Sequence, residues 1–405
     1  MPSTRRRSTS RRVRTRRAVL AVATVLLGCV LWSYGHALTG PGNDALSIRS
    51  TEWLKDHHFA WAINDVEHWW YTHHQPKVGG VPTGALGRTL RSGLAATKPA
   101  ARANATPAAP SSATPTPTTT AAPKHLPAPP PIAPIASPSL PGEGQWKPLG
   151  QTVGGVLAMY AAFLRPDPIH TSLVTAVTWI DPTLVRIAGY AGVVEPGGAW
   201  PNQAPIPESL RPLLEAAFNS GFKMRDARGG FYADGRYARP LVTGAATLVI
   251  SPDGTPDVGQ WGRDVRMGPG IAFARQNLSL IVDGGHPVSN LTSDSTAKWG
   301  ATVGNNVYVW RSGLGVTADG ALVYAGGNGL SVATLADVLA RAGAVRAMEL
   351  DINSAWVDFF SYTPATFGQP AADLGVIKLL PDMRPSTSDY LTASSRDFIA
   401  VFRRF

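Results

Sequence analysis

The chain falls into stretches with different hydrophobic periods, and one alternating stretch raises a question about chemistry. Residues 344 to 352, AVRAMELDI, alternate apolar and polar positions as a β-strand does. Glu349 and Asp351, followed by Asn353, would then share one face of the strand. Such a face is consistent with a solvated surface, with a catalytic acid pair, or with oxygen ligands for a divalent cation from Asp351, Asn353 and Asp358.

An uninterrupted apolar run occupies residues 18 to 38. A run of about 20 uncharged residues can span a bilayer, and the arginine-rich tail at residues 1 to 17 would stay in the cytoplasm. The run therefore predicts a single membrane anchor with the C-terminal domain outside the cell. Cleavage after Ala37, as in a signal peptide, would instead give a secreted protein.

Residues 39 to 75 show the three-to-four-residue spacing of an amphipathic helix. Its tryptophans predict a juxtamembrane helix at the outer membrane surface. No two of its five histidines have the i,i+4 spacing of a helical zinc motif, so no metal site is predicted there.

Residues 76 to 148 are rich in Pro, Ala and Thr. Such a composition buries too little apolar surface to form a core, which predicts a disordered linker. Fully extended, a chain of this length would reach on the order of 200 Å. We therefore expect a tether between the membrane and the remaining chain.

Residues 149 to 405 are predicted to form one globular domain. Ser331 and Gly343 would cap and end a helix between them. Short strands with few helices indicate an α+β (mixed α/β) fold. Asp-Gly pairs beside β-prone residues predict three hairpins, at residues 232 to 236, 251 to 255 and 317 to 321.

The charge distribution and the cysteine content argue against nucleic-acid binding and against thiol chemistry. The formal net charge is +10, but eight arginines lie within residues 1 to 17, and without them 29 Lys and Arg face 27 Asp and Glu. The remainder is nearly neutral, which argues against nucleic-acid binding. Cys29 is the single cysteine, so the exported part has neither disulfide nor thiol chemistry.

Glycine-rich polar stretches supply candidate binding residues. Glycine lets backbone amides approach a ligand, and an arginine fork binds phosphate through two hydrogen bonds. The sequence has no Walker A loop and no GxSxG elbow, so neither nucleotide nor serine-hydrolase chemistry is indicated, and no cofactor is required. The candidate substrate-binding residues are Asn219, Ser220, Gly221, Arg311, Ser312 and Asp319.

The order of these motifs resembles the phosphodiester glycosidase family, typified by N-acetylglucosamine-1-phosphodiester α-N-acetylglucosaminidase. Members carry an Asn-Gly-Gly-Phe-Phe strand end, an arginine hairpin with an Asp-Gly turn, a short helix, and a strand ending in Leu-Asp-Gly-Gly-Gly-Ser. The sequence is similar to a divergent actinobacterial, membrane-anchored branch. The matching positions, within residues 200 to 360, are Asn219, Arg311, Gly315, Asp319, Gly320 and Asp351.

The resemblance implies cleavage of a sugar-1-phosphodiester in cell-wall or capsule glycans. Arg311 would hold the phosphodiester, and Asp351, with Glu349 from the acid pair, would act at the anomeric carbon. Two departures stand out: Ser220 replaces a glycine, and Ile352-Asn353-Ser354 replaces the glycine triplet. They leave a second interpretation open, an anchored non-catalytic domain that binds envelope glycan.

Overall fold

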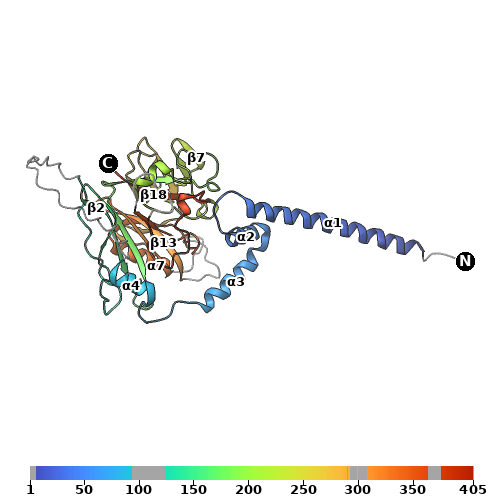
Figure 1. Cartoon of the computed structure of the whole chain (residues 1–405), viewed down its shortest axis with the longest axis horizontal. Coiled ribbons are helices and arrows are strands. Elements are labelled where there is room, and N and C mark those ends of the chain that lie inside the picture. The colour runs from blue at the N-terminus through green and yellow to red at the C-terminus, as the bar shows by residue number, and fades with distance from the viewer. Residues whose placement is uncertain are drawn as a thin grey trace, which may run out of the picture.

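Three β-sheets form the globular part of the protein, and the first N-terminal helix extends from it (Figure 1). The fold is strand-rich with few helices, so the predicted α+β class is confirmed. The computed structural model describes residues 6–93, 124–289, 291, 299, 308–363 and 375–404.

The largest sheet has eight strands in the order β1-β2-β3-β14-β13-β15-β11-β12. The predicted strand near residue 344 is β15, which pairs with β13 on one side and β11 on the other. The strands are β1 (Lys147–Val153), β2 (Val156–Leu164), β3 (Thr175–Ile180), β11 (Leu280–Asp283), β12 (His286–Pro287), β13 (Val309–Thr317), β14 (Leu322–Leu330) and β15 (Ala344–Glu349).

Helix α7 (Val332–Arg341) packs on this sheet. Ser331 is its N-cap, as predicted, and forms a capping box with Thr334. Gly343 follows the helix with a positive φ of 97°, a conformation that glycine adopts without strain. The apolar side of the helix is fully buried through Leu335, Val338 and Leu339.

Two five-stranded sheets complete the domain, in the orders β17-β16-β5-β18-β4 and β7-β6-β10-β8-β9. One hydrophobic core joins the first of them to the large sheet. In it, the Phe218 ring stacks on the Phe359 ring and also packs against the Tyr324 ring, with distances between ring centroids of 5.4 and 5.3 Å. The elements are β4 (Val185–Tyr190), η2 (Glu208–Leu213), β5 (Leu214–Asn219), α5 (Met224–Ala227), β6 (Phe231–Ala233), β7 (Arg236–Arg239), β8 (Ala246–Ile250), β9 (Pro256–Gln260), β10 (Phe273–Gln276), β16 (Phe360–Thr363), β17 (Gly375–Lys378), η5 (Asp389–Leu391) and β18 (Phe398–Arg403).

All three predicted Asp-Gly hairpins are confirmed. They connect β6 to β7, β8 to β9 and β13 to β14, each pair antiparallel. In the first, Asp234 and Gly235 have positive φ values of 46° and 87°, as a two-residue hairpin turn requires.

The N-terminal helix α1 (Arg6–Thr39) points away from the domain (Figure 1). Its segment Thr15–Thr39 is long and apolar enough to cross a membrane, which fits an anchor or a signal sequence. The single helix expected over residues 39 to 75 is instead two, α2 (Leu46–Leu54) and α3 (Ala60–His73). The π-helical turn η1 (Lys55–Phe59) separates them, because His58 adopts a left-handed φ of 69°.

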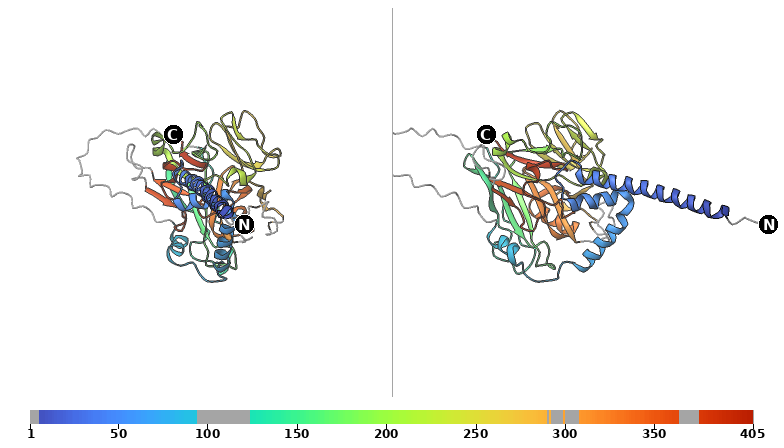
Figure 2. Two further views of the ribbon diagram at one scale, coloured as in Figure 1. Left: turned by 90° about the vertical axis from the view of Figure 1, so that its right-hand side faces the viewer. Right: turned by 45° about the vertical axis from the view of Figure 1, so that its right-hand side comes forward.

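The segment after α1 contacts the domain directly, and α2 and α3 lie along one side of it (Figure 2). Polar contacts from residues 43 to 56 reach both the loop after β5 and the loop before β18. They are Asn43–Thr392 (2.8 Å), Asp44–Ser395 (2.7 Å), Glu52–Lys223 and Asp56–Arg225 (2.7 Å).

Much of the expected linker also packs on the domain. Leu90 of α4 (Gly84–Ser92) and Ile132 are 1% and 2% exposed, and Glu143 is buried against Arg165. The globular unit therefore includes residues before 149, and the linker does not by itself set the distance between domain and membrane. The middle of the expected linker, residues 94–123, lies outside the described residues.

Candidate functional site

A buried ion pair lies at the end of the alternating strand. Gly313 of β13 is the register partner of Glu349 of β15, which brings the Arg311 side chain to the same end of the sheet. Arg311 Nη1 donates to Glu349 Oε1, and Arg311 Nε donates to the Leu330 carbonyl at 3.0 Å. The two charged residues are 4% and 0% exposed. The solvated-face interpretation of the alternating strand is therefore excluded.

Within the part of the chain that the structure describes, only one of the two oxygens of the Glu349 carboxyl accepts a hydrogen bond. Its Oε2 atom is buried and has no hydrogen-bond partner among the described residues. Burial disfavours the charged form and raises the pKa of Glu349 to about 7, although Arg311 opposes the shift. The side chain therefore exchanges a proton near neutral pH, which suits a general acid or base.

Asp351 lies two residues further on, where the chain leaves β15. The Ser312 amide donates to the Asp351 carbonyl at 2.9 Å, and the Leu350 amide donates to the Ser312 carbonyl at 2.8 Å. Asp351 Oδ1 accepts from the amides of Ile352 (2.8 Å) and Asn353 (3.0 Å). The backbone of Ile352 and Asn353 thus holds the carboxylate.

The Asp351 carboxyl is also close to neutrality. Burial raises its pKa to about 6, while the Arg396 guanidinium and the two backbone amides act in the opposite direction. Arg396 Nη2 lies 3.8 Å from Asp351 Oδ2. Glu349 and Asp351 therefore form a pair of neighbouring acids that titrate close together, and their protonation is coupled.

The strand end at Asn219 meets Asp351 through Arg396. Asn219 Oδ1 accepts from the Gly221 amide at 2.8 Å, which closes a tight turn after β5. Arg396 Nη2 donates to the Gly221 carbonyl at 3.0 Å while facing Asp351. Ser220 Oγ donates to the Asp397 carbonyl at 3.0 Å.

Most of the predicted site residues are therefore neighbours. Asn219, Ser220 and Gly221 approach from β5, Arg311 and Ser312 from β13, and Glu349 and Asp351 from β15. Asp319 is the exception. It lies in the turn at the opposite end of β13, where its carboxylate accepts from the Thr317 hydroxyl.

Side-chain oxygens of Asp351, Asn353 and Asp358, which could have bound a divalent cation, already accept hydrogen bonds from protein groups. Asn353 Oδ1 accepts from the Ala355 amide at 2.9 Å, and Asp358 accepts from the Tyr390 hydroxyl at 2.7 and 2.9 Å. Protein donors thus already face these oxygens, as they face Asp351 Oδ1. Within the described part of the chain, no three His, Cys, Asp or Glu residues group as metal ligands.

Four further buried polar residues complete the site. Arg275 is fully buried and pairs with Asp397 at 2.6 Å. Asn277 Nδ2 donates to the carbonyls of Glu349 (2.5 Å) and Leu350 (2.8 Å), and thereby fixes the backbone of the acid pair. The fourth is Arg396. The sequence signal for Arg275 and Asn277 was the run of Arg, Gln and Asn at residues 275–277, where β10 ends at Gln276 and all three residues are buried.

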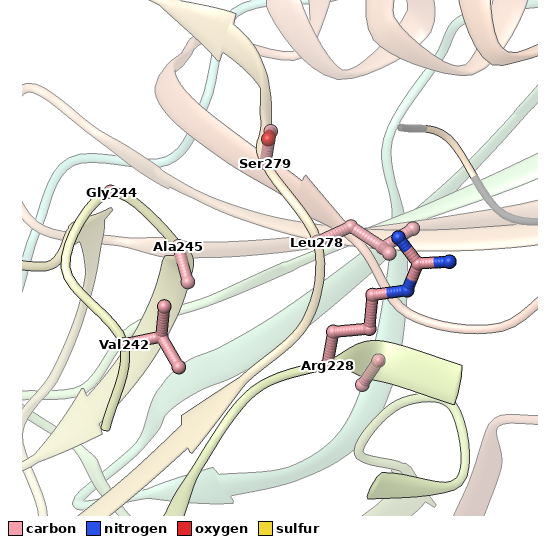
Figure 3. A pocket seen from close by; sticks show the side chains of 7 residues that line it. Arg228, Val242, Gly244, Ala245, Leu278 and Ser279 are labelled. Atoms are coloured by element: carbon pink, nitrogen blue, oxygen red, sulfur yellow. The ribbon is translucent and has the colours of Figure 1, made fainter. Parts of the chain in front are cut away.

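An open pocket of about 310 Å³ lies beside this site (Figure 3). It is lined by the end of α5, the loop before β8 and the two residues that follow Asn277. Glu349 and Asp351 are not among its lining residues, which are Ala227, Arg228, Val242, Gly244, Ala245, Leu278 and Ser279.

No family model and no curated protein matches the chain. Three solved structures are distantly similar to it. The catalytic domain of zebrafish N-acetylglucosamine-1-phosphodiester alpha-N-acetylglucosaminidase, auto-inhibited by its pro-peptide, is 14% identical, with a TM-score of 0.39 over 64% of this chain and 88% of that one. A hypothetical protein from Synechocystis is 13% identical, with a TM-score of 0.36 over 64% of each chain. An exported protein from Burkholderia pseudomallei K96243 is 12% identical, with a TM-score of 0.32 over 58% of this chain and 75% of that one.

Proposed function

We propose that the protein is an extracytoplasmic, membrane-anchored hydrolase that cleaves a sugar-1-phosphodiester in cell-wall or capsule glycans. The observation that carries the proposal is the buried acid pair Glu349 and Asp351, with pKa values of about 7 and 6. Cleavage of a glycosidic bond needs one carboxylic acid and one carboxylate at neutral pH, and this pair can supply both. The sequence resemblance independently points to the same chemistry.

The proposed step divides roles between the two acids. Protonated Glu349 donates its proton to the phosphate oxygen as the bond between that oxygen and the anomeric carbon breaks. Ionised Asp351 accepts a proton from the water that attacks the carbon. The sugar leaves with a hydroxyl group, and the phosphate leaves as a monoester.

Asn219 to Gly221, Arg311 and Ser312 are the proposed substrate-binding residues. In the structure, the Gly221 amide donates to Asn219 Oδ1, and Arg311 donates to Glu349 and to the Leu330 carbonyl. Substrate groups that bind to these residues would therefore replace their intramolecular partners. Such exchange gives specificity, because a ligand that lacks matching groups leaves buried polar atoms unpaired.

Membrane anchoring is supported by the arrangement of the N-terminal segment. Asp44 accepts from Ser395, the neighbour of Arg396, so the chain leaving α1 contacts the loop that carries a site residue. The exposed Trp61, Trp69 and Trp70 on α3 suit the water–lipid interface. The proposed site would then work close to the outer membrane surface.

The proposal is tested with the full chain in detergent and a GlcNAc-1-phosphodiester as substrate. We expect release of GlcNAc, and we expect Asp351→Asn to abolish it. Asp337→Asn, on the exposed side of α7, is the matched control and should retain full activity. Undiminished turnover by Asp351→Asn would refute the mechanism.

A non-catalytic domain that binds envelope glycan is the second candidate. The burial of both acids and the loss of the family's glycine triplet favour it. Calorimetry with envelope glycan fragments separates the two: heat of binding without product release supports the binding domain, and product release supports the enzyme.

A further inference from the structure

The cations near the candidate site differ in whether they have partners. Lys223 pairs with Glu52, and Arg225 pairs with Asp56 at 2.7 Å, both with acids of the juxtamembrane segment. Arg228, three residues later, is exposed. Within the described residues it forms no hydrogen bond or ion pair. Its guanidinium is therefore available to an anion from solution.

Arg228 belongs to the 310 Å³ pocket, which has polar and apolar walls. In Figure 3, Val242, Gly244 and Ala245 lie on the left of the view and Arg228 and Leu278 on the right, with Ser279 above. Ser279 adds a hydroxyl group to the lining. A compact anion with an attached apolar or sugar group fits such walls.

Backbone strain marks the same place. Leu278 has a left-handed φ of 55°, which is rare for a bulky side chain and costs on the order of 1 kcal/mol or more. The Ala246 amide holds this conformation by donating to the Leu278 carbonyl at 2.9 Å. The strained conformation turns the chain directly after Asn277, so that Leu278 and Ser279 face the pocket while Asn277 faces the acid pair.

The pocket is one strand away from the acid pair. Leu280 is the register partner of Met348, so the chain at Ser279 runs beside the end of β15 at Glu349. Neighbouring strands are about 5 Å apart. The pocket wall at Leu278 and Ser279 therefore adjoins the strand end that carries the acid pair.

We infer that the pocket at Arg228 is an anion subsite that holds the phosphate of the substrate, an inference that rests on the proposed function. Arg311 is less suited to this task, because it is buried and already bonded to Glu349 and the Leu330 carbonyl. In this arrangement Arg311 influences the pKa of Glu349, and Arg228 binds the phosphate and so selects for a phosphorylated substrate.

Binding is tested apart from turnover by titrating the full chain in detergent with inorganic phosphate and with dimethyl phosphate in a calorimeter. Arg228→Gln should weaken binding of both probes about tenfold, the effect of losing one charged hydrogen-bond donor. Arg384→Gln, at an exposed arginine between β17 and η5 without a described partner, is the control and should bind as the wild type does. Equal affinity of wild type and Arg228→Gln for both probes would overturn the inference.

The turnover assay then distinguishes this inference from the proposed function. If wild type cleaves a GlcNAc-1-phosphodiester, Arg228→Gln should raise KM about tenfold with a smaller change in kcat. An unchanged KM would overturn the subsite and leave the enzyme proposal intact. Phosphate binding that depends on Arg228, without any turnover, would support an anion site at Arg228 and contradict the proposed function.

Discussion

Two buried glutamate–arginine pairs in this molecule have opposite electrostatic outcomes. Glu143 pairs with Arg165 where residues 124–148 meet β2, and Glu349 pairs with Arg311 at the candidate site. Both carboxyls are almost completely buried. Burial would raise the pKa of each, but hydrogen bonds lower the pKa of Glu143 below its usual value, whereas that of Glu349 rises to about 7.

The number of donors explains the difference. Glu143 accepts from the Arg165 side chain at Nε (3.0 Å) and Nη2 (2.8 Å), and from the amides of Arg165 (3.0 Å) and Leu140 (2.9 Å). Glu349 accepts from one Arg311 nitrogen and has a buried oxygen without a described partner. A fully satisfied carboxylate stabilises a fold, and an under-satisfied one holds a proton that can take part in chemistry.

Removing the arginine of each pair should change the free energy of unfolding by different amounts, and the loss at Arg165 should be the largest. Arg165→Met should cost about 3–5 kcal/mol of unfolding free energy, because it leaves Glu143 charged and buried. Arg311→Met should cost clearly less at about pH 7, since Glu349 can take up a proton. Denaturant unfolding of the full chain in detergent gives both values. Equal costs would show that the two pairs do not differ as described.

Replacing each glutamate by glutamine should change stability in opposite directions at about pH 8. Glu349 has a raised pKa, so the folded state binds its proton more tightly and loses stability as pH rises from about 4.5 to about 7. Glu349→Gln, which mimics the protonated form, should therefore stabilise the protein, on the order of 3 kcal/mol above pH 7. Below the usual glutamate pKa the variant and wild type should be equally stable.

Glu143→Gln should destabilise the protein at the same pH. Its pKa is lowered, so its contribution is present above the usual glutamate pKa and is lost as pH falls through the folded-state value. We expect a loss of about 1–3 kcal/mol, the cost of weakened charged hydrogen bonds. Unfolding curves at several pH values test both variants, and destabilisation by Glu349→Gln at about pH 8 would contradict the account.

The alternation in residues 344 to 352 correctly predicted a strand, which ends at Glu349, two residues before Asp351. Alternation alone could not decide whether that face is wet or buried, because burial depends on which segments pack against it. The buried outcome depends on Arg396 and Asn277, which are distant in sequence and reach the site only through the sheet topology.

For residues 76 to 148, composition again could not predict burial, and here the prediction of disorder was wrong for the parts that pack on the domain. The Pro-rich composition predicted disorder, yet Ile132 is buried against the domain, and Glu143 is fully hydrogen-bonded. A few apolar residues and one acid are enough to pack a Pro-rich chain against a domain that is already folded. Composition measures what a segment can bury by itself, not what a neighbouring domain offers it.

The activity should depend on pH through the coupled acids. Turnover needs Asp351 ionised and Glu349 protonated, so its rate should peak between pH 6 and 7, the two pKa values of the pair. Initial rates of GlcNAc release across this range test the expectation. A rate that rises steadily to about pH 9 would show that no protonated acid is required.

The smallest effect is expected at the exposed pair of Arg225 and Asp56, both about half exposed. Asp56→Asn should change stability by less than about 1 kcal/mol, because water competes for both charges. The change should disappear at about 1 M salt. Unfolding at low and high salt checks this, and a loss as large as that of Arg165→Met would remove the distinction between exposed and buried pairs.

The proposed reaction requires that Glu349 holds a proton and donates it to the substrate. This requirement is tested most directly by the kcat for GlcNAc release from a GlcNAc-1-phosphodiester between pH 6 and 7, compared for wild type and Glu349→Gln at saturating substrate. Because the variant is expected to be folded and at least as stable as wild type, lost activity cannot be attributed to unfolding. We expect Glu349→Gln to lower kcat at least about 100-fold. An unchanged kcat would contradict the proposed reaction.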